Sequence, residues 1–386
     1  MKIFRTDRPP NERMDMRLSF CVVLSLVICG TGTTRAQDIS SYLKNIKAVG
    51  AEGDGNQLAG KAWKDLVDQG IDALIPTLTA MDDAKPVAVN WLRLAAQTIA
   101  EREQQAKKKL PTDKLEAFVI DSKHAPVSRR LAYELLLRED KTASDRLLPD
   151  FIEDPSVDIR YDAIAQAIEK TTPLVKSEPE KAAKEFAKLF HAGRDKDQVE
   201  KIAKTLKELK VPYDLNTHFG VVTNWMLVGP FDSTNGAGYE KPYEPETKVE
   251  LAAKLKSKEG KDIAWIAHKV MEDYGVVDLN KALGKHKDAA AYAFTVVETD
   301  KEMPVEIRFG CISAIKIFLN GKEVFAREEY HHGQRFDQYV GIGTLKGGRN
   351  EILLKVCQNN QTDSWAQDWK FQLRLCDFTG GALPVK

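Results

Sequence analysis

The sequence predicts a multidomain protein of mixed class, in which an α-solenoid of helix pairs comes first and an antiparallel β-sandwich follows. Three observations support this prediction. A short apolar segment stands apart at the N-terminus, the apolar period of the next half is helical, and that of the last half is alternating. A chain of 386 residues suffices for two or three domains, and we place them at 1–36, 37–211 and 212–386.

The first domain is a predicted secretory signal peptide. Leu18–Gly30 is largely apolar, follows basic residues, and precedes a small-residue segment that permits cleavage after Ala36. The run is shorter than the roughly 20 residues that a membrane-spanning helix needs. We therefore expect a secreted or periplasmic protein with no membrane span. A lipid anchor at Cys29 is the alternative, because Leu26–Cys29 resembles a bacterial lipobox, although Ile28 is larger than that motif prefers.

Charge and cysteine content argue against two classes of protein. The chain has 57 Lys/Arg and 57 Asp/Glu; without residues 1–36 it keeps 51 basic and 54 acidic residues, a net charge near −3. This balance does not favour binding to nucleic acid or to an anionic membrane. The three remaining cysteines, Cys311, Cys357 and Cys376, are too few for a disulfide framework, so we expect free thiols. If residues 351–358 and 369–377 paired as a hairpin, Cys357 and Cys376 would lie roughly 23 Å apart.

The helical half repeats itself at an interval of about 40 residues. The repeated units are Leu78–Val87, Phe118–Val127 and the shorter Phe151–Val157. In each unit a proline stands one or two residues before the valine. This pattern predicts helix pairs that bury their apolar faces against the next pair. A final pair is expected over residues 180–210.

Asp154–Ala163 resembles the turn and second helix of a HEAT repeat. Val127–Arg130 gives a second instance of the Val-x-x-Arg core, and Asn90 takes the place of the arginine in the first unit. The resemblance covers roughly 140 residues. It implies a concave surface that binds another macromolecule, which we expect to be a protein partner.

The last half predicts about nine short strands with no long helical pattern between them. The expected strands include Val221–Val228, Trp265–Val270, a pair around Tyr292 and Ile307, Ile315–Leu319, Tyr339–Leu345, Ile352–Val356 and Phe371–Leu375. Asn320-Gly321 between alternating runs predicts a type I′ hairpin, since both central residues need positive φ. Such a pattern is typical of an antiparallel sandwich or jelly roll.

A glycine-rich loop, Gly236-Ala-Gly238, invites comparison with phosphate-binding loops. Pro242 and Pro245 follow almost at once and disfavour the helix that such a loop should open. We therefore interpret the loop as a turn at the entrance to the sandwich.

Ile317–Val324, Leu345–Leu353 and Trp369–Arg374 are together similar to galactose-binding-like jelly rolls, which accompany many secreted bacterial glycoside hydrolases. The shared pattern is an Asn-Gly-Lys hairpin followed by Leu-x-x-Gly-x-Asn. The resemblance implies a jelly-roll fold and a carbohydrate as the ligand of some members, while many such domains bind no sugar.

The densest polar cluster is the loop Arg327–Asp337, which contains Tyr330, His331, His332, Arg335 and Asp337. Two interpretations stay open, a solvated loop between strands or a ligand site. Adjacent histidines on a strand point to opposite faces, so a shared metal would require a turn. We assign no metal, no cofactor and no catalytic residue, because the metalloprotease and nucleophile-elbow motifs do not occur.

Aromatic residues beside polar loops favour a sugar more directly. Trp365 lies in a polar segment, and an exposed indole can stack on a sugar ring while its N–H stays in water. Trp369 begins the last strand, and we expect it in the core, as we do Trp225 and Trp265.

These observations predict a secreted, non-enzymatic binding or scaffold protein. Its helical array would hold a protein partner, and its sandwich would bind a glycan or an envelope component. The alternatives are a polysaccharide-acting enzyme or its accessory subunit, and a purely structural envelope protein.

Overall fold

The computed structural model describes residues 31–386, with side chains from Asp38 onward. The predicted signal peptide and the alternative anchor at Cys29 lie outside the residues with described side chains. The chain forms two compact units, Met1–Ala80 with Ala84–Ile99, and Met81–Asp83 with Ala100–Lys386. The predicted boundary at residue 212 stays a prediction.

The first unit is helical. It contains α1 (Thr31–Lys47), α2 (Asn56–Val67), α3 (Leu74–Ala80) and most of α4 (Pro86–Gln105). Helix α1 packs against α2 and α3. Leu66, Leu74 and Leu78 are fully buried, so the apolar stripe of this segment forms a core.

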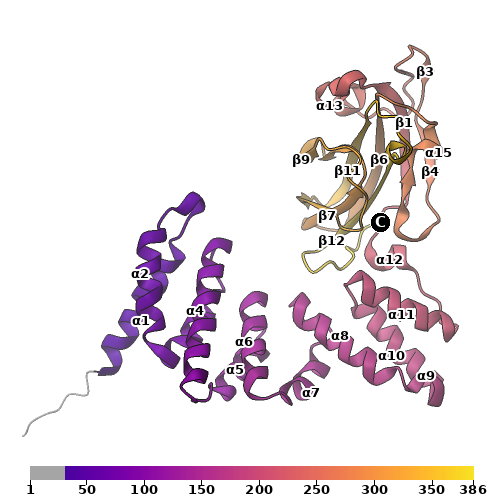
Figure 1. Ribbon diagram of the computed structural model, residues 1–386. Helices are drawn as coiled ribbons and strands as arrows, with labels where there is room; N and C mark the ends of the chain where they lie inside the picture. The colour runs from indigo at the N-terminus through magenta and orange to yellow at the C-terminus, as the bar shows by residue number, and fades with distance from the viewer. Residues whose placement is uncertain (1–30) are drawn as a thin grey trace, which may run out of the picture. The chain divides into compact units, whose positions relative to one another are not determined.

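The second unit begins with further helices. They are α5 (Thr112–Ile120), α6 (Pro126–Glu139), α7 (Ala143–Leu147), α8 (Val157–Thr171), α9 (Leu174–Ser177), α10 (Pro179–Ala192), α11 (Lys196–Glu208) and α12 (Leu215–Phe219). The pair expected over 180–210 is confirmed as α10 and α11, which pack against each other and against α8. Figure 1 shows α12 leading from these helices to the strands.

The first residues of the helices change how the repeats align with one another. Pro126 is the first residue of α6 and Val157 is the first residue of α8, so these two residues correspond, rather than Val127 and Val157. Proline suits this first position because its missing N–H has no intrahelical partner there. The corresponding buried arginines are therefore Arg129 and Arg160, the fourth residue of each helix.

Two antiparallel sheets follow the helices. The larger has the order β4-β1-β6-β11-β8-β9 and the smaller the order β10-β7-β12-β5. The strands of the larger sheet are β4 (Ile266–Lys269), β1 (Asn224–Asp232), β6 (Ala289–Thr299), β11 (Gly348–Gln358), β8 (Ala314–Leu319) and β9 (Lys322–Arg327). Those of the smaller are β10 (Tyr339–Leu345), β7 (Met303–Cys311), β12 (Lys370–Cys376) and β5 (Val277–Asp278).

The two sheets face each other in a sandwich-like arrangement. One buried cluster joins Leu227, Ile317 and Leu354 of the larger sheet to Ile307 and Phe371 of the smaller. Alternate residues of the strands supply this core, as the alternating pattern predicted. The antiparallel β class of the last half is thus confirmed.

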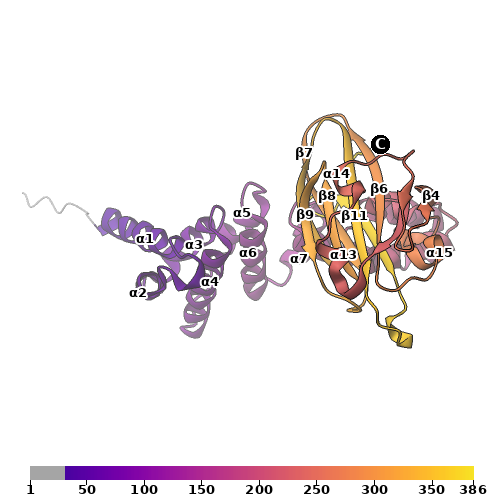
Figure 2. The same ribbon diagram turned by 90° about the horizontal axis from the view of Figure 1, so that it is seen from above.

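The outer face of the larger sheet is also covered. The short helices α13 (Ala237–Glu240) and α14 (Glu244–Thr247) lie beside it in Figure 2. A second buried cluster joins strand residues such as Phe231 and Tyr292 to Tyr239 and Trp265 of the covering segment, which also contains the ribbon β2 (Leu255–Lys256) and β3 (Asp262–Ile263). The chain between β1 and β4 therefore serves as a cap on the sheet.

The two predicted turns have different outcomes. Asn320 and Gly321 have φ of 52° and 79° and join β8 to β9, as the hairpin signal predicted. Gly236 has a φ of 79° and makes the expected turn, but α13 begins directly after it. The expectation that Pro245 would disfavour helix is wrong, because this proline lies in the first turn of α14, where proline is tolerated.

The conditional hairpin of residues 351–358 and 369–377 does not form, because β11 and β12 lie in different sheets. Cys311, Cys357 and Cys376 are buried free thiols. Burial raises the pKa of the Cys311 thiol to about 12, which keeps it protonated and unreactive at neutral pH.

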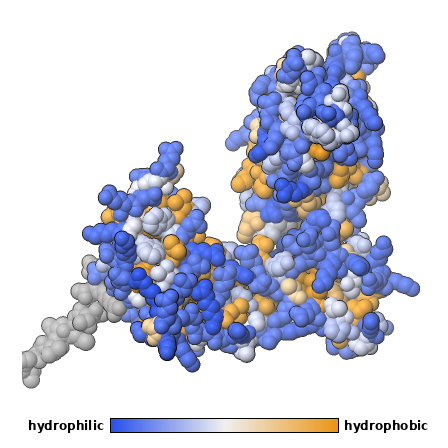
Figure 3. All heavy atoms as spheres, viewed as in Figure 1, coloured by the Kyte–Doolittle hydropathy of each residue, from blue (hydrophilic) through white to orange (hydrophobic). Residues whose placement is uncertain are grey.

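The visible surface is mainly hydrophilic, with scattered hydrophobic patches on both units (Figure 3). Among residues 31–386, no helix combines the length and apolar character that crossing a bilayer requires.

Candidate ligand-binding site

Trp365 lies in the loop that joins β11 to β12. Its side chain is 60% exposed, whereas Trp369, four residues later, is fully buried. Trp225 and Trp265 are buried as well. The predictions of exposure and burial for these four residues are confirmed, and Trp365 is the exposed indole among them.

The loop of Trp365 is held at its base by side-chain hydrogen bonds. Gln367 Nε2 donates to the carbonyls of Thr362 and Asp363 at 2.7 and 2.8 Å. Lys287 Nζ donates to the carbonyl of Ala366 at 2.6 Å. These bonds fix the backbone on both sides of the indole, so the exposed ring stands on an ordered loop.

A second loop, between β9 and β10, brings His331 against this indole. The two rings meet edge to face with centroids 5.5 Å apart. His331 Nε2 lies 2.7 Å from Asn359 Oδ1, and because an amide oxygen accepts, Nε2 donates. His331 Nδ1 is buried and has no hydrogen-bond partner within the described residues. His331 adopts a φ of 57°, so the backbone turns at this residue and the two adjacent histidines do not follow a straight strand.

Tyr330 completes this group, which we call the Trp365 cluster: Trp365, His331, Tyr330 and Asn359. The rings of Tyr330 and His331 lie 6.4 Å apart. The Tyr330 hydroxyl is buried and has no partner within the part of the chain that the structure describes. Burial raises the pKa of this phenol, so the hydroxyl keeps its proton and can donate.

His332 and Arg335 lie apart from the cluster. The His332 ring contacts Tyr339 at a centroid distance of 5.8 Å, so the two adjacent histidines do not share a site. Arg335 is exposed, and its backbone carbonyl lies where a side chain on Gly310 would need to be. Across residues 38–386, no group of three or more His, Cys, Asp or Glu side chains is placed to hold a metal ion.

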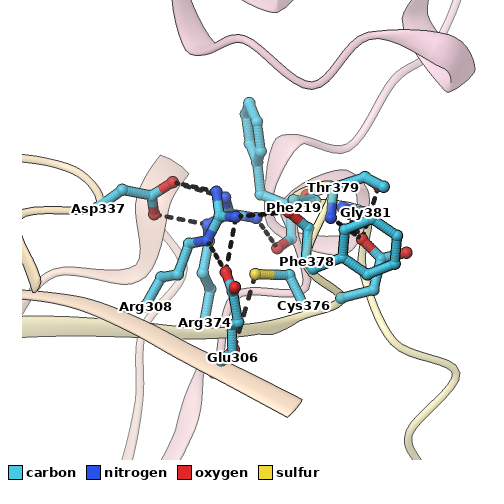
Figure 4. Close-up of polar contacts among 11 residues, drawn as sticks. Phe219, Glu306, Arg308, Asp337, Arg374, Cys376, Phe378, Thr379 and Gly381 are labelled. Carbon is cyan, nitrogen blue, oxygen red and sulfur yellow. Dashed lines mark hydrogen bonds and ion pairs between the residues drawn. The ribbon is translucent and has the colours of Figure 1, made fainter. Parts of the chain in front are cut away.

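Asp337 belongs to a network with the buried Arg374 and the half-buried Arg308 rather than to the cluster (Figure 4). Its two carboxylate oxygens accept from Arg374 Nε and Nη2 at 2.7 and 2.6 Å. Arg308 Nη1 approaches the same carboxylate at 3.3 Å and also binds Glu306. With these partners Asp337 serves as a structural anchor of the loop that carries His331.

The sequence analysis missed Asn359 and Lys287, which position the cluster. Neither belongs to a motif, because each acts through a loop distant in sequence. It also missed the fully buried Lys355 of β11, whose Nζ donates to the carbonyls of Tyr239 and Lys241 and to Glu246 Oε1 at 3.0, 2.7 and 2.9 Å. In the sequence, the sign of these hydrogen bonds was a lysine within the otherwise apolar strand Ile352–Cys357, where a charged group needs partners.

No family model matches the chain, and no curated protein matches it. Among solved structures, a β-glucosidase from Kluyveromyces marxianus matches with a TM-score of 0.23 and 10% identity over 78% of this chain and 38% of that one. A GH31 α-xylosidase from Xanthomonas citri matches with a TM-score of 0.18 and 13% identity over 30% of this chain and 15% of that one. TM-scores of this size do not establish a shared fold, and the chain spans well under half the length of either protein.

Proposed function

We propose that this is a secreted, non-enzymatic binding protein whose sandwich-like part holds a glycan against Trp365. One observation carries the proposal: an indole that is 60% exposed stands on a loop fixed by hydrogen bonds and is buttressed by the edge of His331. Exposing a large aromatic ring on an ordered loop forgoes the stability of burying it. Such a ring is typical of a surface that stacks on a ligand.

The chemistry around the indole suits a sugar. A pyranose presents apolar C–H groups on one face and hydroxyls at its rim, so it needs a flat aromatic surface with amide or hydroxyl groups beside it. Asn359, which bonds to the His331 ring beside the indole, supplies an amide, and its Nδ2 donates to Gln361 Oε1 of the same loop at 3.2 Å.

The two family resemblances of the sequence also support the proposal. The jelly-roll resemblance supports a carbohydrate ligand, and the HEAT-like resemblance supports a helical array that holds a protein partner. Two features support the array. Consecutive helices α6, α8 and α10 pack in sequence order. Arg129 of α6 also reaches across to Asp154, just before α8, with two bonds of 2.8 and 2.7 Å, so this pair of helices is fixed to the next.

A glycan-array screen of the chain from Gln37 onward tests the proposal. We expect a narrow set of binding glycans, all lost in Trp365→Ala and partly kept in Trp365→Phe, since phenylalanine retains a stacking face. Phe378→Ala is the matched control, because Phe378 is 68% exposed in the Asp377–Gly381 turn. That control should bind like the unmodified chain.

Other results would replace the proposal. Absence of binding across a broad array would leave scaffolding between proteins as the better account. Release of shorter sugars from a bound polysaccharide would show hydrolysis and make the protein an enzyme.

A further inference from the structure

A pocket of about 610 Å3 lies away from the Trp365 cluster, among α10, α11, α12 and the C-terminal segment. Its walls include Phe190 and Leu206, and its polar rim includes Arg194, Asp214 and His218. The volume falls within the range of small-molecule sites, and such sites combine apolar walls with a few polar groups.

The pocket has an aromatic wall. The Phe190 ring lies 4.5 Å from the His218 ring and 5.8 Å from the Tyr213 ring, measured between centroids. Burial and the nearby Arg194 charge lower the pKa of His218 to about 4, so its imidazole is uncharged at neutral pH. An uncharged imidazole is compatible with an apolar ring beside it.

Arg194 supplies the positive charge. Its Nη1 donates to the carbonyls of His191, Ala192 and Gly193 at 2.7, 3.2 and 2.8 Å, which fixes the guanidinium at the end of α10. These acceptors are all neutral. Nε lies against Gly381 and has no acceptor within the described residues, which leaves the donors of Nη2 for an outside group.

The acidic residue at the rim is already engaged. The Asp214 carboxylate accepts from the Thr217 N–H at 3.1 Å and from the Thr217 hydroxyl at 2.7 Å, as the N-cap of α12. These hydrogen bonds stabilise the charged Asp214 carboxylate. Asp377 and Glu153 also lie near enough to act on the Arg194 charge, but neither they nor Asp214 forms an ion pair with it within the described residues, so the guanidinium stays open to an outside carboxylate.

We propose that this pocket binds a small organic carboxylate with a flat apolar body. The carboxylate would accept from the Arg194 guanidinium, which suits planar anions. The ring would lie against Phe190, Tyr213 and His218. Neither the cluster nor the proposed glycan takes part, so this inference stands or fails independently of the proposed function.

Titration of the full mature chain with sodium phenylacetate, followed by ligand-observed NMR and calorimetry, tests the inference. We expect saturable binding to the unmodified chain, and at least tenfold weaker binding of phenylacetamide, which has the same ring but no charge. Arg194→Gln should weaken phenylacetate binding at least tenfold and leave phenylacetamide binding unchanged. Arg335→Gln, at an exposed arginine elsewhere, should change neither.

A second variant keeps the test decisive if Arg194→Gln does not fold. Ala187 lines the pocket and is half-buried, so Ala187→Phe should fill the space and abolish binding of both probes. Equal affinities for the acid and the amide would overturn the assignment of a carboxylate. Saturable binding that survives Ala187→Phe, or no saturable binding to the unmodified chain, would overturn the site itself.

Discussion

Arg374 of β12 and Asp337 of the β9–β10 loop form a bidentate ion pair. Arg374 is 2% exposed, and its Nη1 also donates to the carbonyls of Phe219 and Gly380 at 3.2 and 2.9 Å. A single side chain of β12 thus binds the β9–β10 loop, the end of α12 and the C-terminal turn. Asp337 and His331 lie in the same loop, and the His331 N–H is held separately by the carbonyl of Ile312 at 2.8 Å.

Asp337→Asn should lower the free energy of unfolding by about 3 kcal/mol, because it leaves the buried Arg374 charge without its carboxylate. Urea denaturation measures the change. The double variant Asp337→Asn, Arg374→Met should recover part of the loss, since no uncompensated charge remains. A loss below about 1 kcal/mol in Asp337→Asn would show that Arg374 finds sufficient partners without it.

Lys355→Met should destabilise the chain by about 3 kcal/mol, because it removes three hydrogen bonds and leaves Glu246 without its cation. The hydroxyl of Tyr292 also bonds to Glu246, so the effect extends to β6. The matched control is Lys256→Met, whose ion pair with Asp262 is exposed and worth less than about 1 kcal/mol. Chemical denaturation compares the two; similar small losses would contradict the structural role of Lys355.

Trp369→Ala and Trp365→Ala should differ in stability. The first removes a fully buried ring and should cost about 3–5 kcal/mol, while the second should change the free energy of unfolding by less than about 0.5 kcal/mol. Thermal unfolding of both variants checks this difference. A large loss in Trp365→Ala would mean that the indole supports the fold, and its exposure would no longer indicate a ligand.

His218 should make stability depend on pH below neutrality. Its pKa in the folded chain is about 4 and its ordinary value is 6.5, so between these values the unfolded chain binds more protons. The contribution of His218 is therefore complete above pH 6.5 and is lost as the pH falls towards 4. It should amount to about 3 kcal/mol, because the pKa differs by 6.5 − 4 = 2.5 between the two states and a difference of one is worth about 1.4 kcal/mol.

Comparison with His218→Gln isolates this effect from the other titrating groups. The difference in unfolding free energy between the two chains should shrink as the pH falls from 7 to 4. A constant difference across that range would show that His218 is not held uncharged.

The sequence predicted the strands well because alternation and the Asn320-Gly321 turn are local signals. It also separated the exposed Trp365 from the buried Trp369, since polar neighbours surround the first and an apolar strand follows the second. The role of Asp337 was not predictable, because this residue lies in a loop and its partner lies 37 residues later on strand β12. An arginine between Leu373 and Leu375 was the sign that a buried charge needed a carboxylate.

The helical half shows the same limit. The repeat spacing predicted the helices. It did not predict which residue of Val127–Arg130 is buried, because a shift of one residue in the alignment of the repeats changes the answer. The cap over β6 and β11 was missed because its helices have only four residues each and because α14 contains Pro245, which the pattern counted as a break. Its bond to Lys355 depends on chain segments more than 100 residues apart.

Calorimetric titration of a glycan that binds the unmodified chain, repeated with Trp365→Ala and Phe378→Ala, tests the central claim most directly. The account predicts that Trp365→Ala lowers affinity at least tenfold, or about 1.4 kcal/mol, with unchanged thermal stability, and that Phe378→Ala binds normally. Unchanged affinity in Trp365→Ala would contradict the claim and place any glycan site elsewhere on the molecule.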